Sequence, residues 1–157
     1  MSTKATTATA TYTILGTTDH ITTCDHCGRT ELKGTVALTR DDSTDVIYMG
    51  STCAARAITR TGRKTSAANV RDEAAAMRRY MLEDAAAARE LLAHYGIDAD
   101  TDSPVIGSQL DAATVLYRAA HRDAVWAAAK SETQWRESVM GMVVRRRAQV
   151  AAARVLR

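Results

Sequence analysis

The sequence Cys24-Asp25-His26-Cys27-Gly28-Arg29, with Gly50-Ser51-Thr52-Cys53 further along the chain, decides the fold that we expect. Two cysteines with two residues between them reach one metal ion only where the backbone turns tightly, and Gly28 permits that turn. The third cysteine follows residues typical of a helix N-terminus. Thiolates arranged in this way bind zinc with tetrahedral geometry. We therefore predict a small structural Zn²⁺ site whose ligands include Cys24, Cys27 and Cys53.

Short strands and a helix are predicted around these cysteines. Alternating and β-branched residues indicate strands over residues 11–15, 32–39 and 46–49. The polar run 40–45 has the composition of a turn, so the last two strands form a β-hairpin. A helix is expected to begin at Cys53, and a short basic linker over residues 59–65 follows it.

The Cys-x-x-Cys-Gly turn of residues 24–28, called the knuckle below, is followed by a hairpin and a helix N-terminus. This order resembles the treble-clef zinc finger. In that family the helix normally supplies two ligands near one another. Here Arg56 stands three residues after Cys53, and an arginine does not bind a metal. The resemblance therefore implies a fold and leaves the fourth ligand open.

Several residues are candidates for the fourth ligand. His20 is the first, because it lies four residues before the knuckle on a polar segment. His26 is the second, since a side chain inside the knuckle usually points away from the ion. Asp19, Asp25 or a water molecule are further options. Three other interpretations of the cysteines stay open: a redox pair, buried free thiols, and a reactive Cys53 whose thiol pKa a helix N-terminus lowers.

Residues 24–33 and 50–56 also resemble small uncharacterised proteins of actinobacteria and their phages. The shared motifs are C-x-x-C-G-R, an L-K before a strand, and G-S-x-C-A-A-R before helices of variable sequence. The resemblance implies a fold, is compatible with a phage-encoded origin, confers no known activity, and does not extend to the helical part of the chain.

Beyond the basic linker the apolar residues recur at a helical period. Apolar side chains spaced three and four residues apart run from Val70 to Tyr95 and predict a long helix with one apolar seam. Gly96 is its expected C-cap. A second helix is predicted from Ser108, capped with the help of Asp111, and continuing to the last residue. Abundant alanines allow close packing of the two as an antiparallel helical hairpin, similar to a short coiled coil.

The predicted fold class is α+β, organised in three parts. A disordered tail covers residues 1–10, the zinc-binding hairpin module covers 11–65, and the alanine-rich helical hairpin covers 66–157. No apolar run approaches the roughly 20 residues of a membrane span, and the first residues lack a signal-peptide core, so we expect a cytoplasmic protein. Since no P-loop, dinucleotide-binding or serine-hydrolase motif is present, we expect no enzyme activity.

Basic residues gather in two places. Residues 136–157 carry six Lys or Arg against one Asp or Glu, and residues 56–64 hold four cations. Such clusters attract the phosphates of nucleic acid, although cations at a helix C-terminus also favour the helix dipole. The candidate phosphate contacts are Arg56, Arg60, Arg63, Lys64, Arg145, Arg146 and Arg147.

Two functions follow as hypotheses from these features. The first is a zinc-stabilised, nucleic-acid-binding accessory or regulatory protein, in which the zinc module and the basic residues contact phosphates. The second is a protein–protein interaction module that uses the helices to bind a host protein or to form a homodimer. A redox-sensing cysteine protein is a more remote third.

Overall fold

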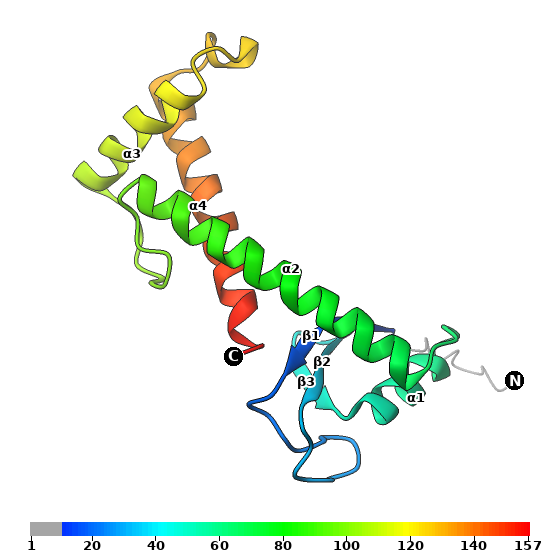
Figure 1. The fold of residues 1–157 in the computed structure, drawn as a ribbon. Helices are drawn as coiled ribbons and strands as arrows, with labels where there is room; N and C mark the ends of the chain where they lie inside the picture. The colour runs from blue at the N-terminus through cyan, green and yellow to red at the C-terminus, as the bar shows by residue number, and fades with distance from the viewer. Residues whose placement is uncertain (1–10) are drawn as a thin grey trace, which may run out of the picture. The chain divides into compact units, whose positions relative to one another are not determined.

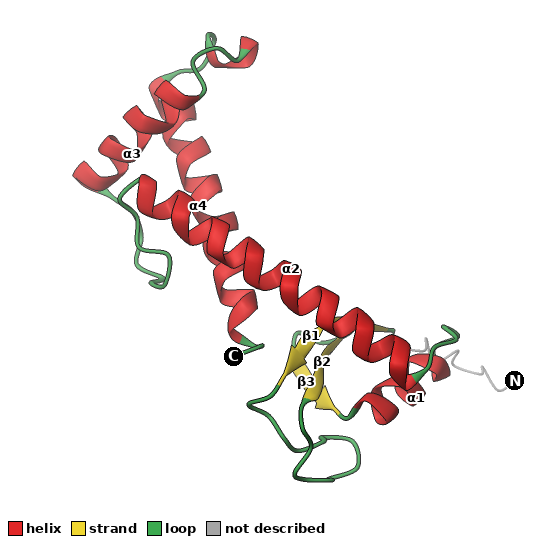
Figure 2. Cartoon of the chain, viewed as in Figure 1, coloured by secondary structure: helices red, strands yellow, loops and turns green. Residues whose placement is uncertain are grey.

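A computed structural model describes residues 11–157 of the chain (Figures 1 and 2). A three-stranded antiparallel sheet is followed by four α-helices, so the predicted α+β class is confirmed. The chain divides into two compact units. The described residues up to Tyr80 form the first together with Val155–Arg157, and Met81–Arg154 form the second. The disordered tail predicted for residues 1–10 lies outside the described residues.

The sheet of the first unit is a meander with the strand order β1-β2-β3. Its strands are β1 (Tyr12–Thr18), β2 (Thr35–Arg40) and β3 (Val46–Met49). Antiparallel pairing of β2 with β3, with Val36 opposite Met49, confirms the predicted hairpin. β1 pairs with β2, and the register shifts between Ile14 and Gly16, where one extra residue enters β1 as a bulge.

Two predicted strand limits are wrong. β1 passes the bulge and continues to Thr18, whose hydroxyl accepts a hydrogen bond from the backbone N–H of His20. The second strand begins at Thr35 and not at Leu32. The backbone N–H of Leu32 donates to the carbonyl of Thr22 and is therefore not available for strand pairing. Residues 32–34 consequently belong to the loop that carries the first two cysteines.

Two helices share the core of the first unit with the sheet. They are α1 (Ser51–Arg60) and the beginning of α2 (Ala67–His94). The buried side chains of this core include Ile14, Leu38, Met49, Ile58 and Val70. The segment Val155–Arg157 belongs to the same unit: Leu156 is fully buried and lies against Gly16, and the Tyr48 hydroxyl donates a 3.0 Å hydrogen bond to the Val155 carbonyl.

The second unit contains three helices. The later part of α2 and α3 (Gly107–Ala120) both pack against α4 (Glu132–Arg154). Leu92 of α2 shares a buried cluster with Val139 and Val143 of α4. A second cluster, made of small side chains, contains Ala85, Ala88, Val150 and Ala153. Among the described helices, none combines the length and the apolar character needed to cross a bilayer.

The predicted single helix from residue 108 to the end of the chain is wrong. Between α3 and α4 the backbone forms only a short 3₁₀ turn, at Val125–Ala127. Aromatic side chains fold this segment back on itself: the His121 ring stacks on Tyr117 with centroids 4.1 Å apart, and Trp126 lies 5.9 Å from Trp135. The backbone N–H groups of Ala124 and Ala127 donate to carbonyls three residues earlier, as in a turn, and not four residues earlier as in an α-helix.

A capping box begins α4. The Ser131 hydroxyl accepts from the N–H of Gln134, and the Ser131 N–H donates to the Gln134 side chain at 2.8 Å. The box predicted at Ser108 does not form, since α3 begins at Gly107 without a side-chain cap. Asp111, its expected partner, forms an ion pair with Arg136 instead.

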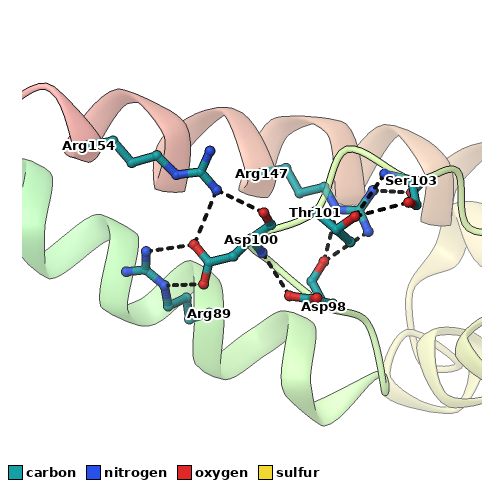
Figure 3. A network of polar contacts seen from close by, with 7 residues as sticks. All are labelled: Arg89, Asp98, Asp100, Thr101, Ser103, Arg147 and Arg154. Carbon is teal, nitrogen blue, oxygen red and sulfur yellow. Dashed lines mark hydrogen bonds and ion pairs between the residues drawn. The ribbon is translucent and has the colours of Figure 1, made fainter.

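Figure 3 shows how the second unit holds the loop that follows α2. The Asp100 carboxylate accepts hydrogen bonds from Arg89 of α2, at 3.0 and 3.2 Å, and from Arg154 of α4, at 3.3 Å. These bonds, the Arg89 bond first, lower the pKa of the Asp100 carboxyl to about 2. Arg147 donates to the carbonyls of Asp98, at 2.9 and 3.0 Å, and of Ser103, at 2.6 Å. The arginines of α2 and α4 therefore fasten this loop.

Candidate metal centre

Three thiols meet beside the sheet of the first unit. The sulfur atoms of Cys24, Cys27 and Cys53 all lie within 4.8 Å of one another. A tetrahedral zinc ion bonded to sulfur at about 2.3 Å would hold its sulfur ligands roughly 3.8 Å apart. Small side-chain adjustments therefore suffice for this cluster to hold a metal ion, and the three cysteines come together as predicted.

A tight turn presents the first two thiols. The N–H of Gly28 donates to the carbonyl of Cys24 at 2.8 Å, and the N–H of Cys24 donates to the carbonyl of Arg29 at 2.9 Å. Gly28 has a φ of 72°, a conformation that strains residues with a side chain, so the turn requires a glycine. The prediction that Gly28 permits the tight turn between the cysteines and the following residue is confirmed.

Asp25 attaches this turn to β3. Its backbone N–H donates to the carbonyl of Tyr48 at 2.8 Å, and its carboxylate accepts from the Tyr48 N–H at 2.7 Å. The sequence presented Asp25 only as a candidate ligand. Its bracing role was missed because the partner stands 23 residues away, with no local pattern to indicate it.

The third thiol comes from the first turn of α1. This helix begins at Ser51, two residues earlier than predicted, directly after β3. Tyr48 of β3 is hydrogen-bonded to Asp25 of the cysteine turn, and α1 follows β3 in the chain. The segments that supply the three thiols are therefore both attached to the same end of β3.

The surroundings of the thiols set their pKa values apart. Burial disfavours the Cys24 thiolate, but hydrogen bonds from the backbone of Gly50, Cys27 and His26 outweigh it and lower the pKa of Cys24 to about 7. For Cys53, burial and then hydrogen bonds with the other two thiols raise the pKa to about 11. A metal ion that takes three thiolates must displace the Cys53 proton, so its binding releases protons and strengthens as the pH rises.

The structure does not bring His20 to the thiols. Its ring lies 3.7 Å from the Asp19 carboxylate, and its side chain is 65% exposed. Within residues 11–157 the group of side chains that can hold a metal has three members, all cysteines. Beside these sulfur atoms lies a cavity of about 530 Å³.

The basic residues of the first unit lie in two settings. Arg56 and Arg60, one helical turn apart on α1, line a groove of about 390 Å³ together with the start of α2. Lys64 is exposed in the linker between these helices. Arg63 forms an ion pair with Glu73 of α2.

The arginine run of α4 is partly engaged within the second unit. Arg147 holds the loop after α2, as described above, and Arg146 donates to the Gln149 side chain at 3.0 Å. Arg145 is exposed. Of the predicted phosphate contacts, the structure therefore brings Arg56 and Arg60 together at one groove and gives Arg63 and Arg147 other partners.

No model of a known protein family matches the chain, and no similar protein was found among curated proteins or solved structures. The resemblances to treble-clef fingers and to actinobacterial and phage proteins therefore stay predictions. The structure itself supports a cluster of three cysteines near an N-terminal sheet, consistent with a metal site.

Proposed function

We propose that this protein is a zinc-stabilised module that binds the phosphates of nucleic acid in an accessory or regulatory role. The observation that carries the proposal is the groove between α1 and the start of α2, where Arg56 and Arg60 lie on one wall. Within residues 11–157 neither arginine forms an ion pair, so both guanidinium groups are available to a ligand.

The other groups around this groove also suit a phosphate. Its lining includes hydroxyl side chains from Thr52, Thr59, Thr65 and Ser66. Ser66 immediately precedes α2, and its hydroxyl accepts from the N–H of Asn69, so it begins that helix. The N-terminus of a helix carries partial positive charge and free N–H groups. Guanidinium, hydroxyl and helix N-terminus together favour an anion.

The proposed zinc ion has a structural role in this arrangement. Cys53 lies in α1, the helix that carries Arg56 and Arg60, and the other two thiols come from the knuckle. An ion bound by all three would therefore fix one wall of the groove to the sheet. The proposal assigns no catalytic residue. Metal analysis of freshly purified protein is expected to give one equivalent of zinc.

Fluorescence anisotropy with labelled single-stranded RNA, single-stranded DNA and duplex DNA tests the proposal. The logarithm of the binding constant is expected to fall linearly with the logarithm of salt concentration. The double variant Arg56→Ala/Arg60→Ala should weaken binding at least about tenfold and reduce the salt slope by about 2, one for each lost phosphate contact.

The double variant Arg145→Ala/Arg146→Ala is the matched control, because it also removes two arginines from a helix surface. It should leave the affinity unchanged if the groove is the binding site. Circular dichroism should show that both variants keep the helical content of the parent. Absence of binding to all three probes at low salt would defeat the proposal.

Exposed apolar residues favour a second candidate, the protein–protein interaction module. Ile106, Val115 and Leu116, immediately before and within α3, are 69%, 68% and 41% exposed. In this alternative the helices bind a protein partner or a second copy of the chain. Light scattering should then report a dimer or a complex that Val115→Asp disrupts, and a monomer with no co-purifying partner counts against it.

A further inference from the structure

The cavity beside the three thiols is lined by two segments of the first unit. One is the knuckle with the loop after it, and the other is the beginning of α1. The volume, about 530 Å³, is large enough for a small molecule and not merely for a single water. The lining residues that carry charge are Arg29, Glu31 and Lys33.

Zinc and similar ions need a fourth ligand that the described residues do not place at the thiols. Structural zinc sites are normally closed by four protein ligands, whereas a site with three keeps an open position for another molecule. Of the candidates, His20 is exposed beside Asp19, and the Asp25 carboxylate is bound to the Tyr48 N–H. All three cysteines line the cavity, so a ligand held in the cavity can reach a metal ion bound to their sulfur atoms.

The charges around this cavity decide what can enter it. Three thiolates exceed the charge of a divalent ion by one, so an anion approaches only where positive groups oppose that excess. Arg29 and Lys33 supply them, and within residues 11–157 neither forms an ion pair. Glu31 is the one acidic side chain among the lining residues, so Arg29, Lys33 and Glu31 together carry one net positive charge, which offsets the excess charge of the thiolates.

We propose that Arg29 and Lys33 bind a small anion with an oxygen donor, a carboxylate or a phosphate, which completes the metal site as its fourth ligand. This inference rests on the metal binding proposed above, but it concerns a different surface from the nucleic-acid groove. It makes the centre a binding site for a small molecule in addition to a structural element. Guanidinium groups pair with carboxylates and phosphates through two parallel hydrogen bonds, and an ammonium group adds a point charge.

Cobalt substitution provides a test that needs no enzymatic activity. Full-length protein loaded with Co²⁺ is titrated with acetate and, separately, with inorganic phosphate, while perchlorate keeps the ionic strength constant. Visible absorption bands of cobalt depend on its ligands. A saturable change with acetate, phosphate or both is expected, and the comparison shows which oxygen donor the site takes. Perchlorate alone should cause no change.

Three variants identify the residues responsible. Arg29→Ala/Lys33→Ala should lower the affinity for the anion at least about tenfold, since charge-assisted hydrogen bonds are lost. Glu31→Gln should strengthen it, because one opposing charge leaves the lining. Arg79→Ala, which removes an exposed arginine of α2 outside this cavity, should leave the anion affinity and the cobalt spectrum unchanged.

Several results would overturn the inference. One is a cobalt spectrum that no anion alters, and another is an equal response to perchlorate. A third is a Glu31→Gln variant whose spectrum already differs from the parent without added anion, because Glu31 would then be the fourth ligand. Protein that takes up no cobalt defeats the metal proposal together with this inference, whereas protein that takes up cobalt but ignores anions defeats the inference alone.

Discussion

The arginines of the two units differ in what their guanidinium groups contact. In the first unit Arg56 and Arg60 line a groove without ion-pair partners in the described part of the chain. In the second unit Arg89, Arg147 and Arg154 all bind the loop after α2 (Figure 3). The densest arginine cluster of the sequence is thus partly structural, while Arg56 and Arg60 of the sparser cluster have no ion-pair partner within residues 11–157. Clustering of charge along the sequence therefore does not indicate which charges a ligand can reach.

The largest expected difference between the two units is their response to metal removal, which should destabilise the first unit and leave the second folded. Binding of structural zinc contributes on the order of 10 kcal/mol in small zinc modules, and this is folding free energy. A strong chelator, or Cys53→Ser, is expected to abolish amide protection in β1–β3 and α1 while α4 keeps its protection. Hydrogen exchange with mass spectrometry measures this segment by segment.

Protection that persists in the sheet after the metal is removed would show that the first unit folds without an ion.

The pH dependence of zinc affinity provides a second measurement of the same interaction. Because binding displaces the proton of Cys53, whose pKa is about 11 without a metal, zinc affinity should fall as the pH is lowered. Competition with a chromophoric chelator at several pH values checks the direction.

Loss of Arg147 should have an intermediate effect, confined to the second unit. Arg147→Ala removes three hydrogen bonds to the Asp98 and Ser103 carbonyls and should lower the free energy of unfolding of this unit by about 1–2 kcal/mol. Arg145→Ala is the matched control, since Arg145 is exposed on the same helix. Hydrogen exchange of α4 amides reports both values. Equal effects of the two variants would mean that the loop contacts contribute nothing.

The smallest expected effect concerns Asp100. Its pKa is about 2 in the folded chain, below the roughly 3.9 of an unfolded aspartate. The ion pairs therefore stabilise the second unit fully above the unfolded value, and this stabilisation is lost as the pH falls through about 2. Asp100→Asn should lower the melting temperature slightly at pH 6 and less at pH 2, where the carboxyl is partly protonated in the folded chain. A difference that does not depend on pH would contradict the assignment to charge.

Most of the secondary structure of the first unit could be predicted from the sequence, because the patterns that indicate it are local. The Cys-x-x-Cys-Gly turn, the polar run 40–45 and the alternation of the strands are each read within a few residues. Leu32 was assigned to a strand because its apolar neighbours alternate correctly. Only the bond of its N–H to the Thr22 carbonyl, ten residues earlier, reveals the loop.

The second unit was harder to predict since alanine-rich sequence is helical almost everywhere. The break before α4 had one readable signal, the Ser131 to Gln134 capping box, which the uninterrupted apolar spacing obscured. No sequence signal indicated the role of Arg147, because its acceptors are backbone carbonyls 49 and 44 residues away. At the candidate site, the three thiols were predictable from their spacing, whereas the brace of Asp25 depends on a distant strand.

The return of residues 155–157 to the first unit has a consequence for biosynthesis. Leu156 is fully buried there, and the Val155 carbonyl accepts the Tyr48 hydroxyl. A ribosome makes the sheet and the cysteines first, yet the unit to which they belong is incomplete until the intervening 74 residues, Met81–Arg154, have been made. Nascent chains released before Val155 therefore lack part of the core that surrounds Gly16.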